Sequence, residues 1–186
     1  MISDWSLVKN LAKVTTLWIS YAMIMYTRLY LVRYLPGDIY INQSSSYCAE
    51  LTGVLLIQIF MKTMEKKNLI KMFFILLGIG TYILLATTIY QSVEEKTIYI
   101  PVSQFFISMG TTGSINTLYL AHNDLFPAVF RSTTLGICNI LARGLAMFAP
   151  LIAEIPEPYP EWFLFTVSTI AICTSFFLEK KSDKFY

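Results

Sequence analysis

One charged side chain lies in the middle of a long apolar run near the C-terminal end of the sequence. Arg143 is ten residues from either end of the expected segment 133–153. At about 1.5 Å per helical residue it lies ~15 Å deep, near the midplane of a bilayer. A guanidinium at that depth needs an ionic partner, a water-filled cavity or a function. Asn139 and Gly136 precede it by successive helical turns, so we expect this small-to-polar stripe to face other helices.

Two further ionisable residues lie within apolar runs. Glu50 is about one helical turn inside segment 46–61, and Arg28 is ~10 Å from the outer end of segment 14–35, where its side chain could reach outwards. In a structural interpretation, Glu50 neutralises Arg28 or Arg143 and these charges only hold helices together. In a functional interpretation, Arg143 faces an aqueous cavity and binds an anionic group. The residues by themselves leave both interpretations open.

Aromatic residues in segment 14–35 also have two interpretations. Trp18, Tyr21, Tyr26 and Tyr30 could form a cage for a cation, because aromatic faces attract positive charge. They are spread over nearly the whole segment, however, which is equally typical of packing residues and of anchors at the membrane interface.

The other reactive residue types do not form a recognisable site. The three cysteines, Cys48, Cys138 and Cys173, lie in apolar runs without metal-ligand spacing, and His122 is the lone histidine. The sequence has no recognisable catalytic serine or cysteine arrangement, paired carboxylates or glycine-rich phosphate loop. We therefore predict a protein that is not an enzyme and that uses no metal and no cofactor.

The composition is that of a membrane protein. Of 186 residues, 55% are hydrophobic and 14% are charged, and the mean hydropathy is +0.57. Soluble domains carry about 25% charged residues. The long apolar runs therefore indicate an integral, multi-pass protein in a lipid bilayer. Nucleic acid is not an expected partner, because no basic face with interleaved aromatic residues is present.

The apolar runs predict an all-α fold with six membrane-spanning helices in one bundle over residues 14–178. Each run has roughly the length needed to cross ~30 Å of hydrocarbon, and backbone groups in lipid must be satisfied within their own segment. The expected spans are 14–35, 46–61, 69–90, 98–121, 133–153 and 162–178. Small residues such as Gly78, Gly80, Gly110 and Gly113 mark where helices could approach closely.

The distribution of basic residues predicts the orientation. If the N-terminal segment 1–13 is cytosolic, ten of the 14 basic residues lie on the cytosolic side and two on the outer side, with Arg28 and Arg143 in spans. Basic residues favour the cytosolic side. We therefore expect both the 1–13 segment and the 179–186 tail to be cytosolic.

Several motifs together resemble one transporter family. The junction DLFPAVFR, from Asp124 to Arg131, is similar to the acidic-Leu-aromatic-Pro-x-x-x-Arg motif after the tenth helix of organic-ion transporters. LARG, which contains Arg143, and the later Pro150 are similar to the eleventh helix of these proteins. GDIYIN, at residues 37–42, and Glu50 resemble the preceding loop and helix. The family comprises the organic cation, organic anion and carnitine carriers of solute carrier family 22, in the major facilitator superfamily.

The resemblance implies a fold, a function and a set of site residues. The chain would be the C-terminal six-helix half of a carrier that moves a small organic ion by alternating access. Arg143 falls where anion and carnitine carriers have an arginine facing the substrate, which favours an anionic or zwitterionic substrate. Asn139 and Glu50 would line the same site. Asp124 and Arg131 fall where the family forms gating ion pairs at the cytosolic junction.

The sequence also differs from the family in ways that suggest an alternative. The loop KTMEKK, at residues 62–67, lacks the leading acid and the glycine of the family motif Asp-Arg-x-Gly-Arg-Arg. Such carriers rock two halves about a site at their interface. A second six-helix unit is therefore expected, which could be an N-terminal half, a second copy or another membrane subunit. The alternative hypothesis is a degenerate half-carrier that does not transport and acts as a structural subunit of a larger membrane complex.

Overall fold

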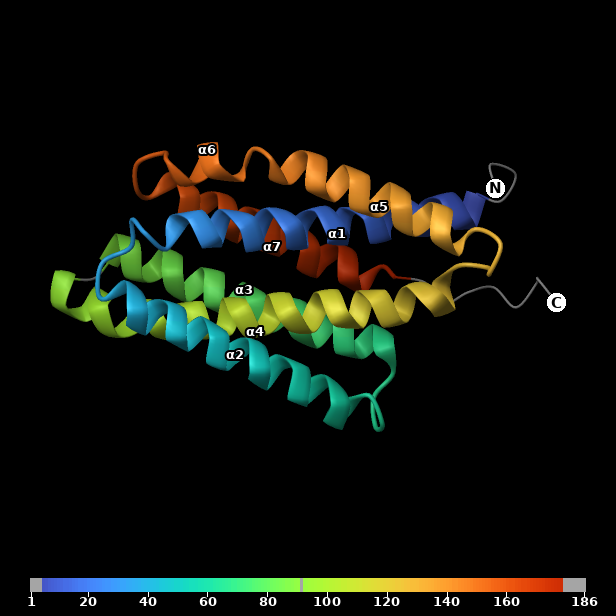
Figure 1. Cartoon of the computed structure of the whole chain (residues 1–186), viewed down its shortest axis with the longest axis horizontal. Coiled ribbons are helices and arrows are strands. Elements are labelled where there is room, and N and C mark those ends of the chain that lie inside the picture. The colour runs from blue at the N-terminus through green and yellow to red at the C-terminus, as the bar shows by residue number, and fades with distance from the viewer. Residues whose placement is uncertain (1–4, 91, 179–186) are drawn as a thin grey trace.

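The computed structural model describes residues 5–90 and 92–178 and consists of helices that lie side by side in an elongated bundle (Figure 1). The expected tail 179–186 lies outside the described residues. Within them there is no β-strand, so the all-α prediction is confirmed. The helices are α1 (Trp5–Leu31), α2 (Ile39–Phe60), α3 (Lys66–Tyr90), α4 (Val93–Leu125), α5 (Arg131–Ala146), α6 (Ala149–Ala153) and α7 (Tyr159–Phe176).

Most of each expected span lies in helix, although residues 32–35 follow the end of α1, and the six-span bundle remains a prediction. Within the described residues, two stretches are long and apolar enough to cross a membrane, Lys66–Tyr90 and Arg131–Ala153. In the apolar part of Lys66–Tyr90, 50% of the residues are buried inside the molecule, whereas in the apolar part of Arg131–Ala153 only 22% are buried. A soluble core helix would bury its apolar surface, so the second stretch requires lipid or a partner around it. The first residue of α1 and the last of α7 lie at the same end of the bundle (Figure 1).

The expected fifth span is interrupted, and Pro150 explains why. A proline has no N–H to donate to the carbonyl four residues earlier, and its ring clashes with that carbonyl. For Pro150 that carbonyl belongs to Ala146, which is the last residue of α5. The chain turns through Met147 and Phe148, and Pro150 then lies in the first turn of α6, where proline is tolerated.

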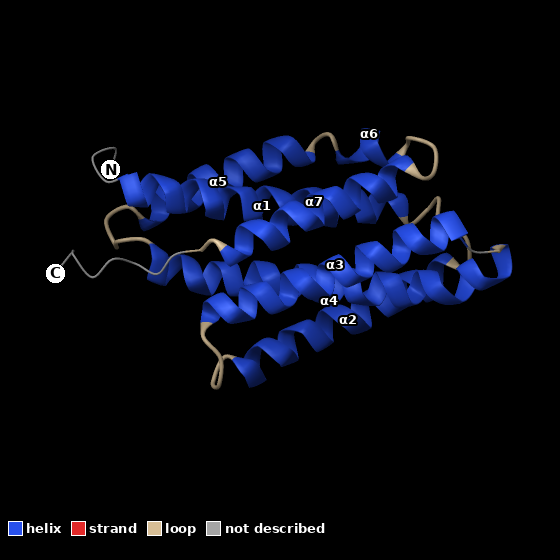
Figure 2. Cartoon of the chain, turned by 180° about the vertical axis from the view of Figure 1, so that it is seen from behind, coloured by secondary structure: helices blue, strands red, loops and turns tan. Residues whose placement is uncertain are grey.

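Two groups of helix contacts build the bundle. α4 packs against α2 and α3, and α3 also packs against α7. α1 packs against α5, α6 and α7 and makes a smaller contact with α4. The main core includes Leu17 and Ile24 of α1, Phe74 and Leu77 of α3, and Ile107 of α4. α2 and α5 lie at opposite edges of the bundle in both views (Figure 1 and Figure 2).

Glycines allow α3 and α4 to lie close together. A Cβ atom added to Gly110 would lie 2.6 Å from the backbone nitrogen of Leu77, and one added to Gly80 would lie 2.6 Å from the backbone nitrogen of Ile107. Neither backbone atom can move without shifting a helix. In α5, by contrast, a Cβ at Gly136 or Gly144 would meet no atom within 4 Å. The tight helix contact is therefore between α3 and α4, and α5 presents its glycines to open space.

The outer face of α2 is apolar and exposed. Four of its large side chains recur every fourth residue and so share one face of the helix. They are 58–70% exposed and comprise Tyr47, Leu51, Leu55 and Ile59. A continuous apolar stripe of this kind is unfavourable in water and is typical of a surface that meets lipid or another protein.

We predict opposite effects for two glycine-to-alanine substitutions inside helices. Gly110→Ala should lower the midpoint of thermal unfolding in detergent, because overpacking costs about 1–3 kcal/mol. Gly136→Ala is the matched control and should keep or raise the midpoint, because alanine favours helix over glycine by up to ~1 kcal/mol. Equal stability of the two variants would contradict the close approach of α3 and α4.

Candidate functional site

A cavity of about 270 Å³ lies between α1, α4 and α5 and contains Arg143 in its wall. Its lining combines aromatic, small and polar side chains from these three helices. They are Trp18, Tyr21, Ala22, Met25, Tyr26, Ile115, Tyr119, Asn139, Ala142 and Arg143. Two of the three predicted substrate-binding residues, Asn139 and Arg143, therefore line one cavity.

A second cavity of about 380 Å³ adjoins the first at Arg143 and Tyr26, which line both. Its other walls come from α1 and from the interruption between α5 and α6, and they are formed by Tyr30, Ala146, Met147 and Pro150. Arg143 is exposed. Among the described residues, no ion pair or hydrogen bond engages its guanidinium. The positive charge thus remains available to a bound anion.

The spacing of small residues in α5 determines where Arg143 lies. Cys138 and Ala142 are buried one turn apart against α1, and the Cys138 sulfur is 3.3 Å from the Thr15 hydroxyl. Arg143 directly follows Ala142 and is therefore placed at the rim of this contact. It also lies in the last turn of α5, where the helix dipole favours a cation. Asn139 donates to the carbonyl of Leu135 over 3.1 Å, which leaves its amide oxygen as an acceptor.

Aromatic side chains form much of the wall of the cavity that contains Arg143. Trp18 is 2% exposed, and its ring meets that of Tyr119 edge to face, with centroids 4.5 Å apart. The Tyr21 hydroxyl donates to the Met25 sulfur over 3.0 Å. Because a fixed guanidinium shares this cavity, a cationic ligand would meet like charge there. The arrangement can bind an anionic group beside an apolar or ring-bearing body.

Glu50 is placed with Arg28 and does not line either of these cavities. Its Oε1 atom lies 3.5 Å from Nη2 of Arg28. The alternative left open by the sequence, a Glu50 partner at either Arg28 or Arg143, is therefore resolved in favour of Arg28. The expectation that Arg28 reaches outwards is wrong. Arg28 is 2% exposed, because Glu50 on α2 and hydroxyl groups on α2 and α4 give its N–H groups acceptors inside the bundle.

The two predicted gating residues lie at the same end of the bundle but do not pair with each other in the part of the chain that the structure describes. Asp124, at the end of α4, accepts from Nζ of Lys66 on α3 over 2.7 Å. Arg131, at the start of α5, donates to the carbonyl of Asn123 over 2.8 Å. The first residue of α3 thus supplies the partner of Asp124.

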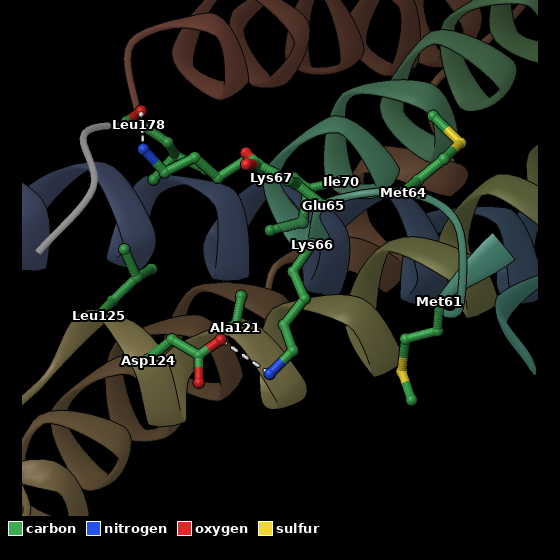
Figure 3. A pocket seen from close by; sticks show the side chains of 10 residues that line it. All are labelled: Met61, Met64, Glu65, Lys66, Lys67, Ile70, Ala121, Asp124, Leu125 and Leu178. Atoms are coloured by element: carbon green, nitrogen blue, oxygen red, sulfur yellow. Dashed lines mark hydrogen bonds and ion pairs between the residues drawn. The ribbon is translucent and has the colours of Figure 1, made fainter.

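A third cavity, of about 330 Å³, surrounds the Lys66–Asp124 pair. Figure 3 shows the Lys66 side chain extending to the Asp124 carboxylate and Lys67 extending to the carbonyl of Leu178. The second of these contacts is 3.2 Å long. Side chains of α3 thereby contact both α4 and the residues after α7 at this end of the bundle.

His122 holds α4 to α5, a role that the sequence did not suggest. The side chain is 1% exposed. Its Nε2 atom lies 2.9 Å from the Thr134 hydroxyl and 3.2 Å from the carbonyl of Arg131, and no hydrogen-bond partner contacts Nδ1 within the described ranges. Burial lowers the pKa of His122, which follows the expected span 98–121. The hydrogen bond with the Arg131 carbonyl raises the pKa and the Arg131 charge lowers it, and the net shift is downwards. The ring is therefore neutral at pH 7.

Comparison with known proteins gives partial similarities to organic-ion transporters. No model of a known protein family matches the chain. The chain is 29% identical over 115 residues to a steroid transmembrane transporter of Oryctolagus cuniculus, a match that covers 60% of this chain and 20% of the relative. It is 36% identical over 70 residues to organic anion transporter 3 of Mus musculus, which covers 36% of this chain and 13% of the relative. The matches span a fifth or less of either relative.

These similarities support the coarser predictions. The relatives are transporters and not enzymes, which agrees with a membrane protein that is not an enzyme. The apolar stretches Lys66–Tyr90 and Arg131–Ala153 support a membrane setting as well. The similarity to organic-ion transporters that the motifs indicated is thus present over part of the chain.

We predict that acid weakens the α4–α5 junction through His122. A histidine whose pKa is lowered by folding contributes stability above its unfolded value, and this contribution is lost as the pH falls below about 6.5. His122→Gln should remove this loss, and because the chain has one histidine it removes all histidine titration. Thermal unfolding in detergent between pH 7.5 and 5 checks this. A difference between the two proteins that does not change with pH would contradict it.

Proposed function

We propose that this chain is half of a major facilitator type carrier that moves a small organic ion, anionic or zwitterionic, across a membrane by alternating access. The observation that carries the proposal is the Arg143 guanidinium, which has no ionic partner among residues 5–90 and 92–178 and lies in a cavity lined by aromatic side chains. Partial similarity to a steroid transporter and to an organic anion transporter supports the same function.

In the proposed site, Arg143 provides a fixed positive charge for the anionic group of the substrate. The apolar body of the substrate would lie against Trp18, Tyr21 and Tyr119, where ring faces bury it from water. Asn139 would contribute its free amide oxygen to a hydroxyl or ammonium group. Glu50 lies outside the lining of this cavity and would act on the substrate only through its charge, together with that of its partner Arg28.

The proposed inner gate is the contact between α3, α4 and α5 at Asp124 and Arg131. The Lys66–Asp124 pair lies at the rim of a cavity and is partly exposed, with 34% and 61% of the two side chains accessible. Exposed pairs of this kind are worth about 0–1 kcal/mol. Opening the bundle at the Lys66–Asp124 pair would therefore break only a weak contact, which suits a gate that opens and closes in every transport cycle.

A second six-helix unit would complete the carrier. Carriers of this type bind their substrate between two halves related by an axis along the membrane normal. The exposed apolar stripe on α2 and the mostly exposed stretch Arg131–Ala153 are surfaces that such a unit could cover. We propose an integral multi-pass protein with both termini in the cytosol, partnered by an N-terminal half, a second copy or another membrane subunit.

The same exposed surfaces favour the alternative function, a non-transporting structural subunit. In that case, α2 and α5 would pack against other subunits of a membrane complex, and Arg143 would pair with an acid of a neighbour. Purification in mild detergent separates the two functions. Stable association with unrelated membrane subunits, without solute-dependent stabilisation, would favour the structural function.

We predict that Arg143→Gln weakens binding of an anionic probe by tenfold or more, because a charge-assisted hydrogen bond is lost. The measurement is equilibrium binding of a radiolabelled steroid sulfate to the purified chain. Arg143→Asp should also raise the affinity for tetraethylammonium. Arg33→Gln, which alters an exposed arginine between α1 and α2, is the matched control and should bind the sulfate normally.

Two outcomes would count against the proposed site. The first is a wild-type chain that binds neither probe and is not stabilised by either of them. The second is sulfate binding that is equally strong in the wild-type, Arg143→Gln and Arg33→Gln proteins.

A further inference from the structure

We propose that Arg28 sets the charge preference of the Arg143 cavity by keeping Glu50 in a neutral pair. Among Arg28, Glu50 and Arg143, the Arg143 charge then remains uncompensated, and the site prefers anions over zwitterions. This inference rests on the proposed function and narrows its substrate class. It assigns Arg28 as a positioning residue that acts through Glu50 and has no contact with the substrate.

The contacts of Arg28 are directed towards two neighbouring helices. Its Nη1 atom donates to the hydroxyl of Ser46 on α2 and to the hydroxyl of Ser108 on α4, each over 2.8 Å. Its Nη2 atom faces Oε1 of Glu50 at 3.5 Å. The Ser46 hydroxyl in turn donates to the carbonyl of Asn42 over 3.1 Å. These contacts hold the guanidinium in one place, with its charge beside the Glu50 carboxylate.

The two partners of this pair differ in exposure. The Arg28 side chain is 3% exposed, whereas the Glu50 side chain is 38% exposed. The carboxylate therefore borders open space while its counter-charge is enclosed by three helices. Removing the Arg28 charge would leave a carboxylate that acts on whatever enters that space.

Arg28, Glu50 and Arg143 lie in one electrostatic neighbourhood. Arg28 lies on the face of α1 that lines the Arg143 cavity, because it follows Met25 by three residues and Tyr21 by seven, and both of these side chains line that cavity. At about 1.5 Å per helical residue, ~10 Å along α1 separates Arg28 from Tyr21. Two charges separated by ~10 Å interact appreciably when the medium between them has a low dielectric constant. A change in the net charge of the Arg28–Glu50 pair should therefore change the affinity for a ligand beside Arg143.

The sign of each variant follows from these charges. With the pair intact, the three residues carry a net charge of +1, which favours an anion. Arg28→Gln leaves Glu50 and Arg143, which sum to zero and favour a zwitterion. Glu50→Gln leaves two arginines, which favours an anion more strongly. The double variant, Arg28→Gln with Glu50→Gln, returns the net charge to +1.

A purely structural role for Arg28 gives different expectations. If the guanidinium only joined α1 to α2 and α4, Arg28→Gln would lower stability, and neutralising Glu50 as well would not restore ligand binding. Arg28→Lys separates the two roles further. It keeps the charge beside Glu50 but loses the paired hydrogen bonds of Nη1 to Ser46 and Ser108.

The test is equilibrium binding of a radiolabelled steroid sulfate to the full chain and its variants in detergent. At an effective dielectric constant of about 20, a unit charge ~10 Å away changes the binding of a monoanion by roughly tenfold. We expect Arg28→Gln to bind the sulfate about tenfold more weakly. The double variant should bind it within about threefold of wild type, and Arg28→Lys should do so too despite lower stability.

Glu50→Gln keeps the test decisive if Arg28→Gln does not fold. It alters only the half-exposed partner and should bind the sulfate more tightly than the wild-type protein. Unchanged or weaker binding by Glu50→Gln would overturn the inference, and so would a double variant that binds no better than Arg28→Gln. A wild-type chain that does not bind the sulfate would instead count against the proposed function, so the two failures are distinguishable.

Discussion

The arrangement of this bundle depends on how a guanidinium is accommodated where water is excluded. Burying an unpaired charge is very costly, so a buried arginine needs acceptors from its neighbours. Arg28 obtains them from Ser46, Ser108 and Glu50, and by doing so it joins α1 to both α2 and α4. Arg143 has no such acceptors within the described residues and lies instead on open space. One arginine therefore holds helices together, and the other is available to a ligand.

Helix packing separates a rigid part of the bundle from an open part. Between α3 and α4, Gly80 and Gly110 bring two backbones close enough that an added Cβ would collide with the partner. Along α5, only one face is filled by small buried residues such as Cys138 and Ala142. The cavities around Arg143 lie on this less crowded side. A binding site beside a tightly packed helix pair has firm support on one side and room for a ligand on the other.

The sequence predicted the helical fold, because long apolar runs are a local pattern, whereas the role of Arg143 in binding stays a prediction. The sequence also placed Asn139 with Arg143, since residues one turn apart share a helix face. It did not identify the partner of Glu50, because ion pairing between helices depends on their rotation and distance in the folded bundle. His122 was missed for a similar reason: its contacts to Thr134 and to the carbonyl of Arg131 exist only once α4 and α5 meet.

The interruption at Met147 and Phe148 divides the fifth expected span into two helices of unequal length. The longer helix, α5, carries Arg143 in its last turn. The short helix, α6, packs against α1 and buries Ala149 and Ala153. Pro150 has already removed the hydrogen bond that would join them. α5 and α6 are therefore separate segments, and Met147 and Pro150 at their junction line the cavity beside Arg143. The break that ends α5 thus also supplies part of the wall beside the charge that we propose meets the substrate.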